Sequence, residues 1–62
     1  MKNQITIEKS KAYEDTVKDL RAALTLEHSW EADPEAKGYL TNIIRHLDNT
    51  LEVFERLHRR LF

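Results

Sequence analysis

Apolar side chains recur along the second half of the chain with the spacing of an α-helix. They repeat in steps of four, three, four and three residues, as Leu40, Ile44, Leu47, Leu51 and Phe54. Residues three and four apart share one face of a helix, so this spacing predicts a helix with an apolar stripe. Pro34 suits the first helical position, and Asp33 before it is a good N-cap. We therefore expect a helix over residues 34–61.

A second helical pattern lies in the first half of the chain. Tyr13, Val17, Leu20 and Leu24 step by four, three and four residues, and Ser10 is a reasonable N-cap before them. The spacing predicts a helix over residues 11–29. The connection between the two predicted helices is short, which favours an antiparallel helical hairpin.

The N-terminal residues alternate between apolar and polar side chains. Ile5 and Ile7 flank Thr6, and such a β-branched run favours a short strand over residues 3–8. A frayed tail is the alternative. A strand with no partner in its own chain must pair elsewhere, and the simplest partner is the same strand of a second copy across a two-fold axis.

The small size of the chain favours assembly. It has 62 residues and no cysteine, so it forms a single domain over residues 1–62 whose core supplies only a few kcal/mol without disulfides. The expected fold is mainly α, an intertwined homodimer resembling a four-helix bundle, with a monomeric hairpin as the alternative. The predicted dimer core comprises Ile5, Ile7, Tyr13, Val17, Leu20, Leu24, Leu40, Ile44, Leu47, Leu51 and Phe54.

Further large apolar side chains fall outside that core. Such a surplus marks an association surface. These residues either cap the dimer core or line a groove for an amphipathic helix of a partner protein. They are Trp30, Tyr39, Ile43, Leu57, Leu61 and Phe62.

The sequence offers little for catalysis or metal binding. Glu55 and His58 have the Glu-x-x-His spacing of carboxylate-bridged di-iron bundles, but the two further inward carboxylates are missing and Arg56 and Arg59 would crowd a cation. No glycine-rich phosphate loop or nucleophile–histidine arrangement is present. We expect neither enzymatic activity nor a metal or cofactor.

The charge balance bears on nucleic acid and membranes. The net charge is −1, which argues against bulk affinity for polyanions. Arg45, Arg56, Arg59 and Arg60 could form a basic strip, although acidic residues interrupt it. A small dimeric RNA- or DNA-binding modulator therefore stays as the alternative function. No run of apolar residues is long enough for a membrane span, and a cytoplasmic location is expected.

The predicted layout resembles a family of small early proteins of lambdoid bacteriophages, encoded between the exonuclease and excisionase genes. The resemblance covers the whole chain through the Ile5-Thr6-Ile7 run, the first helix, the Asp33-Pro34 break and the long second helix. It implies an intertwined homodimer and a non-enzymatic regulator in the bacterial host cytoplasm. Such a protein would promote lytic development and host takeover by binding a host or phage regulatory protein. The family implies no catalytic, metal-binding or cofactor-binding residues.

Overall fold

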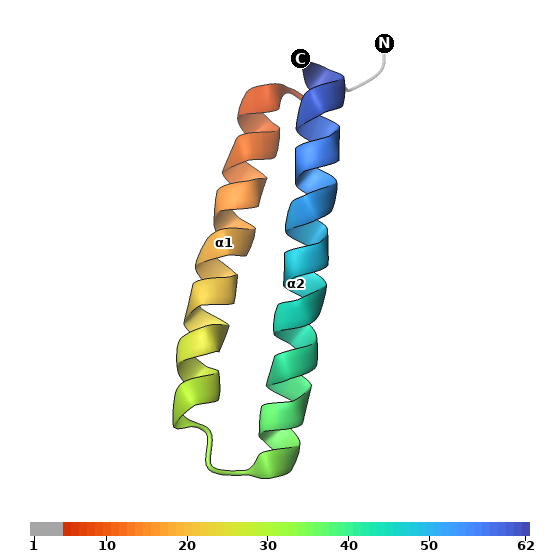
Figure 1. The fold of residues 1–62 in the computed structure, drawn as a ribbon. Coiled ribbons are helices and arrows are strands. Elements are labelled where there is room, and N and C mark those ends of the chain that lie inside the picture. The colour runs from red at the N-terminus through yellow and green to blue at the C-terminus, as the bar shows by residue number, and fades with distance from the viewer. Residues whose placement is uncertain (1–4) are drawn as a thin grey trace.

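The computed structural model describes residues 5–62, which form an antiparallel hairpin of two helices (Figure 1). Helix α1 runs over Ile7–Trp30 and helix α2 over Pro34–Leu61. Residues 31–33 connect them at one end of the molecule, here called the loop end. The start of α1 and the end of α2 meet at the other end, the open end. The extents along the principal axes are 49 × 19 × 15 Å.

Helix α1 begins four residues earlier than the sequence pattern predicts. Thr6 is its N-cap, with an extended backbone, and its hydroxyl oxygen accepts a hydrogen bond from the backbone N–H of Lys9 at 3.1 Å. Glu8 in the first turn complements the helix dipole. Ser10, the predicted cap, lies inside the helix.

The predicted N-terminal strand is therefore wrong over the part of it that the structure describes. Residues 5 and 6 are not in a strand, and residues 7 and 8 are helical. A threonine hydroxyl that caps a helix outweighs the β preference of a run as short as Ile-Thr-Ile. Residues 3 and 4 lie outside the described residues.

Helix α2 covers the range that the sequence predicts. The carboxylate of Asp33 accepts a hydrogen bond from the backbone N–H of Glu35 at 3.3 Å, and Pro34 occupies the first turn. Gly38 lies inside the helix, and a Cβ added there would meet nothing within 4 Å. Gly38 therefore neither ends the helix nor admits another backbone within one copy.

The two helices contact each other along positions that alternate in steps of three and four, as in a coiled coil. These positions, here called the seam, are half-buried or buried in both helices. On α1 the seam contains Ile7, Ser10, Glu14, Val17, Arg21, Leu24 and His28. On α2 it contains Leu40, Ile44, Leu47, Leu51, Phe54, His58 and Leu61.

One copy of the chain has no closed apolar core. Among residues 5–62, no apolar side chain is fully buried, and Ser10 is the one residue that is. Two helices packed side by side can cover only one stripe of each other. The apolar side chains outside the seam therefore stay in water in a single copy.

Candidate interaction surface

Most exposed apolar side chains outside the seam gather on one broad side of the hairpin, with Leu26 and Phe62 as exceptions. Tyr13 and Leu20 each precede a seam residue of α1, and Ile43 and Leu57 each precede a seam residue of α2. In an antiparallel pair, the residues that precede the seam residues lie on the same side of both helices. Tyr39 and Val53 also directly precede seam residues of α2, Leu40 and Phe54, and so lie on this side as well. The resulting apolar face comprises Tyr13, Leu20, Tyr39, Ile43, Val53 and Leu57.

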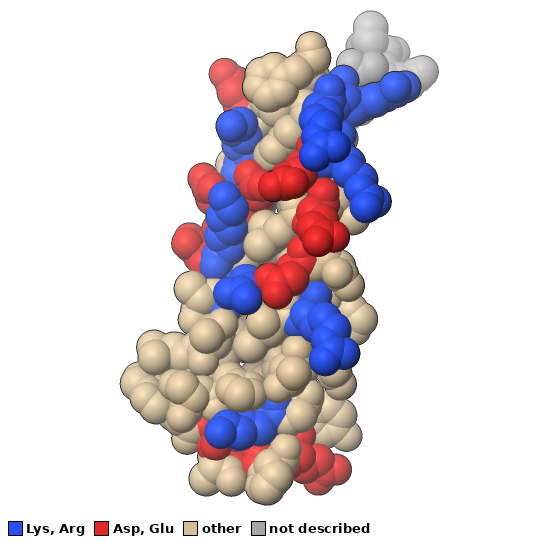
Figure 2. Space-filling model, in the orientation of Figure 1, with Lys and Arg blue, Asp and Glu red and all other residues tan. Residues whose placement is uncertain are grey.

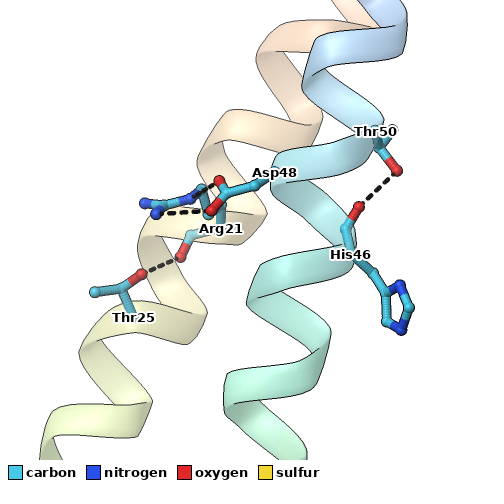
Figure 3. Close-up of polar contacts among 5 residues, drawn as sticks. All are labelled: Arg21, Thr25, His46, Asp48 and Thr50. Atoms are coloured by element: carbon cyan, nitrogen blue, oxygen red, sulfur yellow. Dashed lines mark hydrogen bonds and ion pairs between the residues drawn. The ribbon is translucent and has the colours of Figure 1, made fainter.

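This apolar face is accessible and contains a hollow. Tyr13 is 53% exposed and Val53 is 56% exposed. A hollow of about 170 Å³ on α2 is lined by Thr50, Val53, Phe54 and Leu57. The Thr50 hydroxyl donates a hydrogen bond to the carbonyl oxygen of His46 at 2.9 Å (Figure 3). Because that hydroxyl is already paired, the hollow suits an apolar side chain.

Charged side chains dominate other parts of the surface. Figure 2 shows Lys, Arg, Asp and Glu along both helices on one broad side of the molecule. Seven residues directly follow seam residues on α2, which places them on the side opposite the apolar face. Five of them are charged, and the others are Thr41 and Phe62: the charged ones are Arg45, Asp48, Glu52, Glu55 and Arg59. The hairpin is therefore apolar on one broad side and charged on the other.

An ion pair joins the two helices near their middle. Arg21 on α1 donates from Nε to one carboxylate oxygen of Asp48 on α2 and from Nη2 to the other, the second at 3.3 Å (Figure 3). The hydrogen bond to Asp48, and then its negative charge, raise the pKa of Arg21 further above its already high ordinary value. Arg21 therefore stays charged at any physiological pH, and the contact links the two helices near their middle.

Two further polar contacts cross the seam. His28 Nε2 and the Thr41 hydroxyl oxygen lie 3.0 Å apart. His58 Nδ1 lies 3.9 Å from a carboxylate oxygen of Glu14, and both side chains are nearly covered. Ser10 Oγ and His58 Nε2 are buried without a hydrogen-bond partner in the part of the chain that the structure describes.

The structure divides the predicted dimer-core residues between the seam and the apolar face. The α2 members lie half-buried in the seam. On α1, Val17 and Leu24 are half-buried in the seam, whereas Tyr13 and Leu20 lie on the apolar face. Ile5 and Ile7 are half-buried at the open end. The sequence reasoning missed the polar half of the α1 seam, because its polar members leave no apolar periodicity to follow.

The predicted partner-groove residues do not meet in one place. Trp30 and Tyr39 lie near the loop end, whereas Leu57, Leu61 and Phe62 lie towards the open end. Trp30 is 70% exposed and Phe62 is 90% exposed. Within one copy, these side chains therefore belong to opposite ends of the hairpin, and Ile43 lies between them.

The described residues contain neither a metal-binding cluster nor a membrane-spanning helix. No group of three or more His, Asp or Glu side chains over residues 5–62 is placed to hold a metal ion. Neither of the two helices is both long and apolar enough to cross a membrane. The apolar face, which combines exposed apolar side chains with a hollow, is the candidate functional site.

Comparison with protein families, curated proteins and solved structures finds no match to this chain.

Proposed function

We propose that this chain is a non-enzymatic interaction module that assembles as a homodimer through its apolar face. The observation that supports the proposal is the absence of any fully buried apolar side chain among residues 5–62. Burial of one large aliphatic or aromatic side chain stabilises a protein by about 1.5–3 kcal/mol. A second copy packed on the apolar face would bury several of them and complete a four-helix bundle.

We further propose that the dimer acts as a regulator by binding another protein. The aromatic side chains at the two ends of the hairpin, Trp30 and Phe62, would make that contact, because they are the most exposed large apolar side chains among the described residues. The proposed resemblance to early proteins of lambdoid phages rests on the layout of two helices with an Asp33-Pro34 break, and the strand expected with it is not found over residues 5–8. A role in promoting lytic development in the bacterial cytoplasm, through a host or phage regulatory protein, is part of this proposal.

A pair of neighbouring lysine substitutions tests the proposed surface. Ile43 lies on the apolar face, whereas the adjacent Asn42 is exposed on another side of α2. Ile43→Lys places a charge where the second copy packs, so we expect its mass by sedimentation equilibrium to fall towards that of one copy. Asn42→Lys should retain the mass and helix content of the wild type.

Two results would overturn the proposal. Equal masses for Ile43→Lys, Asn42→Lys and the wild type would show that Ile43 is not at the dimer contact. Salt-dependent retention on RNA or DNA that is lost when Arg56, Arg59 and Arg60 are neutralised would replace protein binding with nucleic-acid binding.

A further inference from the structure

The apolar face carries charged side chains only near its two ends, and their signs differ. Glu27 lies seven residues after Leu20 and so occupies the same side of α1 near the loop end. Arg60 lies seven residues after Val53 and occupies the corresponding side of α2 near the open end. Lys9, at the start of α1, adjoins the face at the open end as well. All three charged side chains are exposed.

At each end of the hairpin, most charged residues have the same sign as the charged residues that the end places on the apolar face. The loop end, over residues 27–37, carries four acidic residues and one lysine: Glu27, Glu31, Asp33, Glu35 and Lys37. The open end, over residues 5–11 and 56–62, carries five basic residues and one glutamate: Glu8, Lys9, Lys11, Arg56, Arg59 and Arg60. The hairpin therefore has an acidic end and a basic end.

We propose that the two hairpins of the homodimer lie antiparallel, apolar face against apolar face, with the loop end of each copy beside the open end of the other. This inference rests on the proposed homodimer. The arrangement places Glu27 of each copy near Lys9 and Arg60 of the other, so opposite charges meet twice. A parallel arrangement would bring like charges together at both ends, which is costly across an interface.

The dimensions of the molecule fit this arrangement. The broad side of the hairpin measures about 49 by 19 Å between Cα atoms. That area is comparable with the roughly 800 Å² that each partner buries in an interface of standard size. Two antiparallel copies overlap along their full length, and a two-fold axis through the middle of the bundle relates them.

The proposal has a consequence for the N-terminal residues. In antiparallel copies, residue 5 of one chain lies at the opposite end of the bundle from residue 5 of the other. The ribbon expected between residues 3–8 of two copies requires those residues to be adjacent. The antiparallel dimer therefore excludes that ribbon.

Charge reversal tests the orientation. Glu27→Lys turns two attractive contacts into repulsive ones in an antiparallel dimer, so we expect the dissociation constant to rise about tenfold at low salt. The triple variant Glu27→Lys, Lys9→Glu, Arg60→Glu exchanges the signs at both ends and should restore the dimer. Glu52→Lys, on the charged side, is the matched control and should leave the dissociation constant unchanged.

Cross-linking gives an independent answer, because the chain has no cysteine of its own. Tyr39→Cys marks the loop end and Arg60→Cys marks the open end. A short bis-maleimide should join the two variants only when they are mixed. The opposite result would be a cross-link between two copies of the same variant and none between the two different variants in the mixture. That result would contradict the antiparallel orientation while leaving the homodimer intact. A wild-type chain that sediments as a monomer would instead overturn both proposals.

Discussion

At the scale of single residues, the two helices contribute side chains of different polarity to the seam. The α2 side is almost entirely apolar, whereas the α1 side includes Ser10, Glu14, Arg21 and His28. Arg21 and His28 find polar partners on α2, at Asp48 and Thr41. Polar contacts across a seam fix the register of two helices at a cost in stability.

Ser10 is the seam residue whose replacement should stabilise the protein. Its buried hydroxyl has no hydrogen-bond partner among the described residues. Ser10→Ala removes the desolvation penalty, so we expect the free energy of unfolding in urea to rise by about 1 kcal/mol. In the control Ser29→Ala, the lost hydroxyl is exposed and donates to the Leu26 carbonyl oxygen, and the gain should be smaller. Lower stability in Ser10→Ala would mean that the hydroxyl is hydrogen-bonded.

Gly38 offers a second stabilising substitution. It lies inside α2 with open space around its Cα. Gly38→Ala should raise the free energy of unfolding by about 1 kcal/mol, because alanine loses less backbone entropy in a helix. Ala22→Gly, at an exposed position of α1, should lower it by a similar amount. A loss of stability in Gly38→Ala would indicate that another chain approaches Gly38 in the assembled protein.

At the scale of the elements, α2 could be predicted from the sequence and α1 only in part. Three signals agree in α2: its apolar repeat, Pro34 at the first position and Asp33 as the N-cap. In α1, the most regular apolar positions include Tyr13 and Leu20, which lie outside the seam. The face that a helix turns to its neighbour depends on that neighbour, so apolar spacing alone could not identify the seam of α1.

The start of α1 provides a test at the same scale. Thr6→Ala removes the hydroxyl that accepts from Lys9 N–H, and we expect it to lower the free energy of unfolding by about 1 kcal/mol. Thr6→Asp keeps an acceptor at the N-cap and should retain the stability of the wild type. Equal stabilities for the two variants, measured by urea unfolding, would argue against a cap at this position.

At the scale of the whole molecule, the fold depends on a small number of half-buried apolar residues. Leu47 lies at the middle of the α2 seam. Leu47→Asp would place an unpaired charge there, and we expect a loss of at least about 3 kcal/mol with a corresponding loss of helix by circular dichroism. Asn49→Asp, at an exposed position two residues away, should retain native helix content. A Leu47→Asp protein with native helicity would contradict the assignment of Leu47 to the seam.

The two broad sides of the hairpin differ in polarity, although a pair of helices that stays monomeric needs no apolar broad side. Sequence periodicity could predict two amphipathic helices and a surplus of apolar residues. It could not show that most of the surplus from both helices would fall on one side, because that depends on which residues of each helix face the other. The same arrangement brings the acidic loop end and the basic open end into positions where a second copy can match them.

The most direct test of the account is thermal unfolding of the wild-type chain, followed by circular dichroism over a wide range of protein concentrations. If a single copy lacks a sufficient core, folding and association are coupled, and Tm rises with concentration. Sedimentation of the folded protein should then give twice the mass of the 7.4 kDa chain. A Tm that is independent of concentration, together with the mass of one folded copy, would contradict the account.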